Sequence, residues 1–527
     1  MKKFYTLSVL LICFISFANA QSDSLIANPG GGDAESFDPI VYNNNLYYEF
    51  RNGSAKSQLA KYDGTSITRI TNPDNGWGVG GFEGQYFTPI VYNNNLYFQY
   101  NNVSGNYKYQ LAKYDGTSVT LIANPDSGIG VEDYTPIVYN NNLYFQYLNV
   151  SVKRQLAKYD GTSVTLIANP DGGNEVNSYT YTPIVYNNDL YFLYYNVSEK
   201  YQLAKYDSTH ASITLIPNPD SGIGVSYTPI VYNNNLYCLY YNVSGNYQLA
   251  KYDGASVTLI ANPDGGTVIN SSMYIQIVYN NNLYFLYFNT SNKYQLAKYD
   301  GTSVTLIANS EGVLGVDNTN YAPIVYNNNL YFLLNISGKN QLAKYDDTSV
   351  TLIANPDSGA EVNSYTPIGY NNDLYFEYTK NIGKSQLAKY DGTSVTPIAN
   401  PDGGAGVEDY NPIVYNNNLY FQYHNESDKY QLAKLSNAPQ QNGIINSTVS
   451  GYSVYPNPND GNFTFEFSNP NNKTVQISIT DITGKTVFET QTTQALYNYT
   501  GNIFQPGIYV VTVKRENCFN VSKMIIK

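Results

Sequence analysis

The stretch PIVYNNNLYFQYLNVSVKRQLAKYDGTSVTLIANP, residues 136–170, decides the fold of this 527-residue chain. Four short segments around it alternate apolar and polar residues, and turn residues bound each of them. We predict strands, termed a, b, c and d, at residues 135–139, 143–147, 155–159 and 163–168. The a–b link is Asn140-Asn141-Asn142 and the c–d link is Asp160-Gly161, and both suit tight reverse turns because Asn and Gly tolerate a positive φ. The stretch therefore predicts a four-stranded antiparallel meander.

The same unit is written nine times along the chain. Copies of the phrase PIVYNNNLYF begin 44 to 50 residues apart. The nine starts are Pro39, Pro89, Pro136, Pro183, Pro229, Gln276, Pro323, Pro367 and Pro412. A period of this length is typical of propellers, solenoids and other repeat arrays.

The ends of the repeat region favour a closed ring over an open stack. Residues 25–29, LIANP, read as a d strand without its unit, whereas the ninth unit stops after residues 431–434, QLAK, and lacks a d strand. A strand supplied from the opposite terminus would complete the last blade and bury two faces that an open solenoid leaves wet. We predict an all-β fold: a large β-propeller of about nine four-stranded blades closed by an N-terminal strand. Nine blades exceed the usual range of about four to eight, so the number stays open between eight and nine.

Composition excludes several classes of function. Charged residues make up 13% of the chain, the net charge is -12, and there are two His, three Cys and one Trp against 57 Tyr. Thinly scattered Lys and Arg do not suit nucleic acid, and the few His and Cys leave little for a metal cluster or a disulfide framework. We expect no nucleic-acid partner, no metal site and no cofactor, with weak Ca²⁺ binding by the acidic loops as the one option left open.

The two ends of the chain carry signals for export. Residues 1–20 combine Lys2 and Lys3, an apolar run and the cleavage site Ala18-Asn19-Ala20, as a secretory signal peptide does, and we predict no transmembrane segment. Residues 21–436 hold the repeats. Residues 437–451 are rich in Asn, Gln, Ser and Gly and predict a linker, and residues 452–527 alternate with period two and predict a small β-sandwich.

Four landmarks in this last segment carry a resemblance to a known family. In order, they are PNPNDG from Pro456, DITGK from Asp481, PGIY from Pro506 and the terminal KMIIK. They resemble the C-terminal sorting domain of type IX secretion substrates of Bacteroidetes. The resembling positions are Pro456, Asn457, Pro458, Gly461, Gly484, Lys485, Pro506, Gly507, Tyr509 and Lys523. The resemblance implies the type IX machinery as a partner and a product that is either released or attached to the outer surface of the outer membrane.

The repeats themselves resemble, loosely, the propeller-forming repeats with a Glu-Leu-Trp and Asp-Gly-Thr signature. Here Gln-Leu-Ala replaces Glu-Leu-Trp in all nine copies, which removes the bulky residue. The resemblance implies extracellular repeats associated with binding or adhesion and names no ligand.

An antiparallel meander places its turns on two different rims of a ring. The a–b and c–d turns fall on one rim and hardly change between copies, whereas the b–c and d–a loops fall on the other and vary in length and content. Variable loops on a rigid scaffold are where recognition usually occurs. The Tyr residues of strands a, b and c recur in register, so we expect them to pack between blades rather than to bind a ligand.

Candidate binding residues therefore come from the variable loops. They are the aromatic and acidic residues Trp77, Tyr86, Glu132, Asp133, Tyr134, Glu175, Tyr179, Glu408, Asp409 and Tyr410. We identify no catalytic residue, because no pair of carboxylates is singled out and His210 and His424 belong to opposite rims.

The sequence thus predicts a non-enzymatic secreted or cell-surface protein that binds an extracellular glycan or protein through the variable rim. The alternative is a propeller glycoside hydrolase or lyase that uses paired rim carboxylates. The identity of the ligand and the anchored or released state of the product stay open.

Overall fold

The structure is a computed structural model, and its two compact units are Ala20–Ser436 and a second one that contains Asn437–Lys527. It describes residues 23–34, 38–54, 56–80, 87–103, 108–131, 135–172, 175–176, 183–268, 276–308, 315–316, 323–336, 338–356, 361–362, 367–379, 384–407, 411–436, 452–455, 459, 461–467, 474–481, 486–501, 503–505, 507–515 and 518–526. The predicted signal peptide and linker lie outside these residues.

The repeats form the predicted antiparallel sheets, which are the blades of an all-β propeller. The a strands are β2 (Ile40–Tyr42), β7 (Ile90–Tyr92), β12 (Ile137–Tyr139), β17 (Ile184–Tyr186), β21 (Gly224–Tyr232), β26 (Ile277–Tyr279), β31 (Ile324–Tyr326), β36 (Ile368–Tyr370) and β41 (Ile413–Tyr415). The b strands are β3 (Asn45–Arg51), β8 (Asn95–Asn101), β13 (Asn142–Leu148), β18 (Asp189–Tyr195), β22 (Asn235–Tyr241), β27 (Asn282–Phe288), β32 (Asn329–Ile336), β37 (Asp373–Thr379) and β42 (Asn418–His424).

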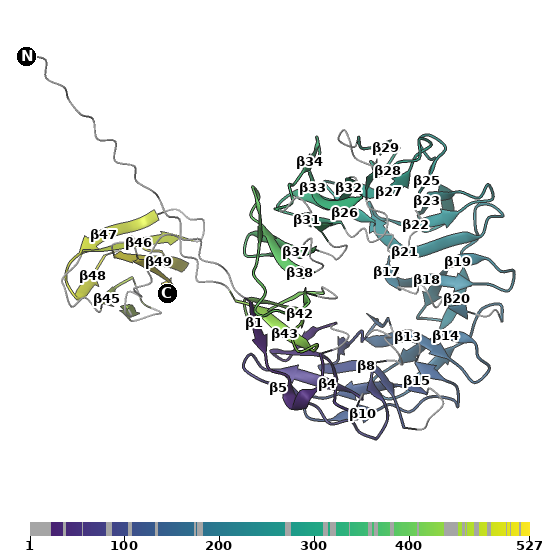
Figure 1. The fold of residues 1–527 in the computed structure, drawn as a ribbon, viewed down its shortest axis with the longest axis horizontal. Coiled ribbons are helices and arrows are strands. Elements are labelled where there is room, and N and C mark those ends of the chain that lie inside the picture. Colours follow the sequence, from purple (N-terminus) through teal and green to yellow (C-terminus); the bar gives the residue numbers. More distant parts are fainter. Residues whose placement is uncertain are drawn as a thin grey trace, which may run out of the picture. The chain divides into compact units, whose positions relative to one another are not determined.

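The c and d strands complete each sheet. The c strands are β4 (Ser57–Tyr62), β9 (Tyr109–Tyr114), β14 (Arg154–Tyr159), β19 (Tyr201–Asp207), β23 (Tyr247–Tyr252), β28 (Tyr294–Tyr299), β33 (Lys339–Tyr345), β38 (Ser385–Tyr390) and β43 (Tyr430–Leu435). The d strands are β5 (Ile67–Arg69), β10 (Val119–Leu121), β15 (Val164–Ile167), β20 (Ser212–Leu215), β24 (Val257–Leu259), β29 (Val304–Leu306), β34 (Val350–Leu352) and β39 (Val395–Pro397). In Figure 1, β17, β26 and β31 lie towards the centre of the ring, whereas β10, β20 and β29 lie at its periphery.

A further short strand precedes strand a and was not anticipated from the sequence. These strands are β6 (Gly78–Val79), β11 (Gly130–Val131), β16 (Glu175–Val176), β25 (Thr267–Val268), β30 (Gly315–Val316), β35 (Glu361–Val362) and β40 (Gly406–Val407). In the third repeat, β11 pairs antiparallel with β13 and parallel with β9 of the preceding repeat. The first part of the variable d–a segment is therefore a regular strand that pairs with two neighbouring sheets, and we call it a stitching strand.

Alternation along strand b fills the seams between sheets. Leu143, Phe145 and Tyr147 pack against the second repeat, whereas Tyr144 packs against the fourth. Within the described residues, nine hydrophobic clusters join successive repeats, and one of them joins the ninth repeat to the first.

Tyrosines dominate these seams, as the sequence predicts. Tyr139 and Tyr144 of the third repeat meet Tyr206 of the fourth: the ring centroids of Tyr139 and Tyr144 lie 5.7 Å apart and those of Tyr144 and Tyr206 lie 5.3 Å apart. The Tyr139 hydroxyl also donates a 2.7 Å hydrogen bond to the backbone oxygen of Asn188 in the next a–b turn. The repeat-locked tyrosines are thus packing residues.

The chain termini of the repeat region close the ring. Strand β1 (Asp23–Ile26) pairs antiparallel with β43, with Leu25 opposite Ala433 and Ile26 opposite Leu432. The single turn of 3₁₀ helix η1 (Pro29–Gly31) follows β1, and the Asn28 side chain donates a 2.7 Å hydrogen bond to the Tyr430 carbonyl. The predicted closure by residues 25–29 is confirmed.

Turn chemistry also follows the prediction. Both Asn140 and Asn141 have positive φ, 44° and 54°, as the a–b hairpin turn requires, and the equivalent Asn pairs of the other eight repeats do the same. In the c–d turn, Gly161 has φ of 99°, while the Asp160 carboxylate accepts hydrogen bonds from the backbone N–H groups of Thr162 and Ser163.

The C-terminal unit is the predicted small β-sandwich. One sheet contains β44 (Tyr452–Tyr455), β45 (Phe463–Phe467) and β48 (Leu496–Tyr499), and the other contains β46 (Val475–Asp481), β47 (Thr486–Thr492), β49 (Gly507–Arg515) and β50 (Cys518–Ile526). Phe463 and Phe465 of the first sheet share a core with Ile477 and Val511 of the second.

Candidate recognition rim

Hydrogen bonds between turns distinguish two rims of the propeller. We call uniform rim the edge with the a–b and c–d turns, where the Asn140 amide donates to the Ser208 hydroxyl of the next repeat. We call variable rim the edge with the b–c turns and d–a segments, where the Lys56 ammonium donates to the Asn75 carbonyl. The two sets of turns assigned to each rim from the sequence therefore do meet there.

Within the described residues, a carboxylate ties six of the d–a segments to the next b–c turn. Asp126 Oδ1 accepts hydrogen bonds from the Tyr147 hydroxyl (2.7 Å) and the Gly128 N–H (2.8 Å), and Oδ2 accepts from the Val150 N–H (3.0 Å). Burial by itself would raise the pKa of Asp126, but these donors and the nearby Lys108 outweigh it and lower the pKa. Equivalent carboxylates that bond both the Tyr hydroxyl and the turn N–H are Asp74, Asp171, Asp220, Asp264 and Asp402.

The Asn of each b–c turn stabilises the turn from within. Asn149 Oδ1 accepts hydrogen bonds from the N–H groups of Ser151 and Lys153, and its Nδ2 donates to Gln155 Oε1 at 2.7 Å. The Asn-x-Ser motifs of the repeats therefore serve as turn residues.

These bonds present the residue after the Asn as a fixed, exposed tip. In repeats two to five that residue is a Val, exposed by 58% to 64%: Val103, Val150, Val197 and Val243. Because the tip N–H is held by a carboxylate of the neighbouring repeat, the variable rim has a rigid base from which side chains and loops project.

The structure brings two of the predicted binding residues onto this rim. Trp77 directly precedes β6, its side chain is 52% exposed, and its backbone oxygen accepts a 2.8 Å hydrogen bond from the Ser57 N–H. Glu175 begins β16, where its backbone pairs with that of Tyr195. The remaining predicted residues lie outside the described part of the chain: Tyr86, Glu132, Asp133, Tyr134, Tyr179, Glu408, Asp409 and Tyr410.

The d–a segment before the second repeat also contains a buried aromatic residue. Phe87 precedes strand a of the second repeat, is buried, and packs against Phe98 with ring centroids 5.8 Å apart. This contact makes Phe87 a structural residue.

The two histidines lie on opposite rims, as expected. His210 Nδ1 lies 2.5 Å from Asp207 Oδ2 in a c–d turn of the uniform rim. His424 ends β42 next to a b–c turn, stacks on Tyr430 with centroids 4.7 Å apart, and lies 3.0 Å from Asp428 through Nε2.

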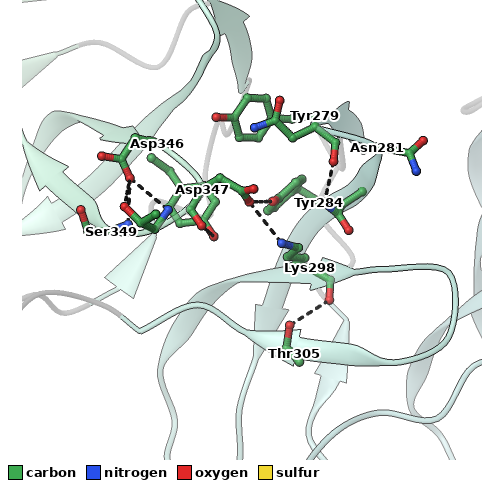
Figure 2. A network of polar contacts seen from close by, with 12 residues as sticks. Tyr279, Asn281, Tyr284, Lys298, Thr305, Asp346, Asp347 and Ser349 are labelled. Carbon is green, nitrogen blue, oxygen red and sulfur yellow. Dashed lines mark hydrogen bonds and ion pairs between the residues drawn. The ribbon is translucent and has the colours of Figure 1, made fainter.

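Turns of the uniform rim form hydrogen bonds across the seams between repeats. In the seventh repeat Asp347 stands where six other c–d turns have Gly, with φ of 74°, and Figure 2 shows it reaching across the seam. Asp347 Oδ1 accepts hydrogen bonds from the Tyr284 hydroxyl (3.0 Å) and the Lys298 ammonium (3.1 Å) of the sixth repeat. Through such hydrogen bonds, the turns of the uniform rim hold neighbouring sheets together.

Sequence reasoning missed a set of aromatic pairs at the base of the b–c turns. Tyr195 faces Tyr201 across strands β18 and β19 with ring centroids 4.7 Å apart. Tyr241 and Tyr247 lie 4.6 Å apart, and Phe288 and Tyr294 lie 4.8 Å apart. The available signal was an aromatic on each side of the Asn-x-Ser turn, as in YYNVSGNY from Tyr240.

The described residues lack two other features, a metal-binding cluster and a membrane-spanning helix. They contain no cluster of three or more His, Cys, Asp or Glu side chains placed to hold a metal ion. No helix among them is long and apolar enough to span a bilayer.

Among the described residues, two positions of the sorting landmarks make hydrogen bonds that explain their residue type locally. Gly461 has φ of 98°, and its N–H donates a 2.8 Å hydrogen bond to the buried Asn459 side chain. The Tyr509 hydroxyl donates to the Gln505 carbonyl (2.9 Å) and accepts from the Gln505 N–H (3.1 Å), just ahead of β49, which begins at Gly507. Lys523 lies in β50, while Pro456, Asn457, Pro458, Gly484, Lys485 and Pro506 lie outside the described residues.

Known structures similar to this chain share little sequence with it. PorZ, a surface component of the type IX secretion system of Porphyromonas gingivalis, is 12% identical over 93% of this chain and 75% of its own, with a TM-score of 0.32. The β-propeller domain of the Trilobed protease from Pyrococcus furiosus is 11% identical over 60% of this chain and 98% of its own, with a TM-score of 0.33. A puromycin-hydrolyzing peptidase of Mycobacterium tuberculosis is 10% identical over 73% of this chain and 57% of its own, with a TM-score of 0.39.

Sequence comparison is informative at the C-terminus. No curated protein matches the chain. The family model described as a secretion system C-terminal sorting domain matches residues 453–527. This match confirms the resemblance carried by the four landmarks and implies interaction with the type IX machinery. The C-terminal domain is a type IX sorting domain, and the protein is secreted or attached to the outer surface of the cell.

Proposed function

We propose that the protein is a non-enzymatic propeller that binds an extracellular glycan or protein through its variable rim. The observation that carries this proposal is the contrast between the rims. On the uniform rim, hydrogen bonds such as that from the Tyr284 hydroxyl to Asp347 join neighbouring repeats. On the variable rim, hydrogen bonds such as that from the Val150 N–H to Asp126 hold the base of the rim and leave its tips exposed.

Repetition supplies the mechanism. Similar tips recur on successive repeats at fixed positions, so weak contacts to a repetitive or extended ligand add up through effective concentration. Because the scaffold is held by carboxylate ties, little conformational entropy is lost when a ligand binds.

Arginine substitutions on either rim test the proposal. The full secreted protein is applied to a glycan array and to immobilised extracellular proteins, as wild type and as variants. Val150→Arg combined with Val197→Arg places bulk and charge on the variable rim, and Thr162→Arg combined with Ala255→Arg does so on exposed c–d turns of the uniform rim. We expect only the first pair to abolish binding. Loss of binding in the second pair alone would assign recognition to the uniform rim.

The alternative, a glycoside hydrolase or lyase, is tested in the same preparation by a polysaccharide hydrolysis screen. Of the rim carboxylates, Glu175 and Glu361 begin the short strands β16 and β35 in different repeats. Turnover that a single Glu→Gln change abolishes would replace the binding proposal by the enzymatic one.

A further inference from the structure

Pairs made of Tyr and Phe alone are confined to three successive repeats, while the ninth repeat holds the stacked pair of His424 and Tyr430 at the same position. In repeats four, five and six, the last residue of strand b and the first residue of strand c are each Tyr or Phe and lie opposite each other. The other six hairpins hold different pairs at this position: Arg51 with Ser57, Asn101 with Tyr109, Leu148 with Arg154, Asn335 with Asn340, Thr379 with Ser385 and His424 with Tyr430. A ring of similar repeats thus has one aromatic arc.

Each pair has the surroundings of a stacking platform. The six rings are partly exposed, unlike the buried tyrosines of the seams, and they lie directly beneath the b–c turns. In each pair the rings are tilted by 45° to 59° relative to one another, so the two do not cover each other face to face. Above the first two pairs, the exposed Val197 and Val243 extend the apolar surface.

The spacing of the pairs suits a linear chain of sugar rings. Facing sheets pack about 10 Å apart, so equivalent positions in successive repeats follow one another at about that interval. Two linked pyranose rings span a comparable length. A sugar ring offers an apolar C–H face to an aromatic side chain and hydroxyl groups at its edge to polar neighbours.

The polar residues near the pairs favour an uncharged glycan. The b–c turn of the fourth repeat carries both Glu199 and Lys200. The b–c turn of the fifth repeat carries Asn246, and that of the sixth repeat carries Asn292 and Lys293. Charges are few and of both signs, which provides no basis for recognising a polyanion.

We propose that the aromatic pairs of repeats four to six bind a neutral polysaccharide, with successive sugar rings stacking along the arc. This inference rests on the proposed function, since it names the ligand class and the place on the variable rim.

The test uses the full secreted protein in affinity gel electrophoresis with soluble arabinoxylan, galactomannan, laminarin and dextran, and with alginate as a polyanion. Wild type is retarded by at least one neutral polysaccharide. Tyr201→Ala combined with Tyr247→Ala weakens that binding by about tenfold or more, because two stacking rings are lost. Tyr201→Phe combined with Tyr247→Phe, which retains both rings, keeps most of the binding that the double Ala variant loses. The matched control His424→Ala, at the same position in the ninth repeat, binds like wild type, and near-UV circular dichroism verifies the fold of each variant.

The outcomes separate this inference from the proposed function. Retardation that survives the double Tyr variant, or retardation by alginate alone, overturns the aromatic site. Binding to an extracellular protein without binding to any of the four neutral polysaccharides overturns the glycan and leaves the proposed function standing. Binding to neither class overturns both.

Discussion

The hydroxyl of Tyr415 donates a 2.7 Å hydrogen bond to the backbone oxygen of Asn44, 371 residues earlier in the chain. The same bond joins Tyr139 to Asn188 between neighbouring repeats. The seam between the ninth and the first repeat is therefore built like the others, and β1 adds the missing outer strand to the ninth sheet. Two independent features, one on the uniform rim and one at the outer edge of the sheet, close the ring.

A disulfide across the closing strands tests this arrangement. Ser24 pairs with Lys434, so Ser24→Cys with Lys434→Cys should form an intramolecular disulfide on oxidation. Because the bond closes a very long loop, we expect stabilisation by up to about 4 kcal/mol, measured by denaturant unfolding with and without reductant. Ser24→Cys with Lys389→Cys, at the equivalent position of the preceding sheet, should not cross-link. Cross-linking of the control pair instead would place β1 on the wrong sheet.

The pairing of the closing strand β1 with β43 should become less stable as the pH rises. Asp23 is buried, neither of its carboxyl oxygens has a hydrogen-bond partner within the described residues, and burial raises its pKa from 3.8 to about 7. The folded state therefore favours the protonated acid, and the stability this provides is complete below pH 4 and is lost as the pH rises through 7. Amide exchange at Leu25 and Ile26, corrected for intrinsic rates, should be faster at pH 8 than at pH 5.

Asp23→Asn removes the titrating group and should abolish this difference in protection. Ser24→Ala, on the neighbouring residue, should retain it. Equal protection of the wild-type strand at both pH values would show that the Asp23 carboxyl does not govern closure.

The carboxylate ties of the variable rim should fail at low pH instead. Asp264 has a pKa of about 2: burial alone would raise it, but hydrogen bonds from Tyr287, Gly266 and Thr290 outweigh burial. A lowered pKa gives stability that is present above pH 4 and is lost as the pH falls through 2. Asp264→Ala should lose the tie at every pH, at a cost of about 1 to 3 kcal/mol for the turn at Thr290. Hydrogen exchange at Thr290 measures the loss, and Asp300→Ala in a c–d turn should leave that amide protected.

Gly369 makes the seam between repeats seven and eight differ from the others. It replaces the Val found at this position in the other eight repeats, and a Cβ there would clash with the Tyr326 ring. Tyr326 has moved accordingly: its centroid lies 6.4 Å from that of Tyr331, against 5.7 Å for Tyr139 and Tyr144. Gly369→Val should return Tyr326 to the usual arrangement and raise stability by about 0.5 to 1 kcal/mol, the cost of Gly in a strand.

Thermal unfolding measures this change, and the reciprocal variant Val414→Gly should lower stability by a similar amount. A large loss on Gly369→Val would mean that the Tyr326 ring is held where it is by more than the missing side chain.

We propose nine as the number of blades, one for each repeat. Electron-microscopy class averages viewed along the ring axis should show nine radial densities. Eight densities would require one repeat to lie outside the ring, and an open arc would contradict the pairing of β1 with β43.

The sequence predicted the fold well because the repeat multiplies every signal. Alternation located β13 at residues 142–148 against a predicted 143–147, and the unmatched residues 25–29 identified the closing strand. The stitching strands such as β11 were missed, since two residues provide no periodicity. The candidate site was harder to predict: the loop of Glu132 lies outside the described residues and stays a prediction, and the aromatic pairs depend on which residues face each other across a hairpin.

The joint between β1 and β43 also sets the order in which the molecule can be completed. The partner of the first strand is made of residues 430–435, so more than four hundred residues must be synthesised before the ring can be sealed. Any product that stops short of Leu435 keeps an unpaired edge and one uncovered seam. An interrupted chain therefore differs from a finished one in its unclosed propeller, and this difference exists before the sorting domain, which follows in the sequence, takes any part.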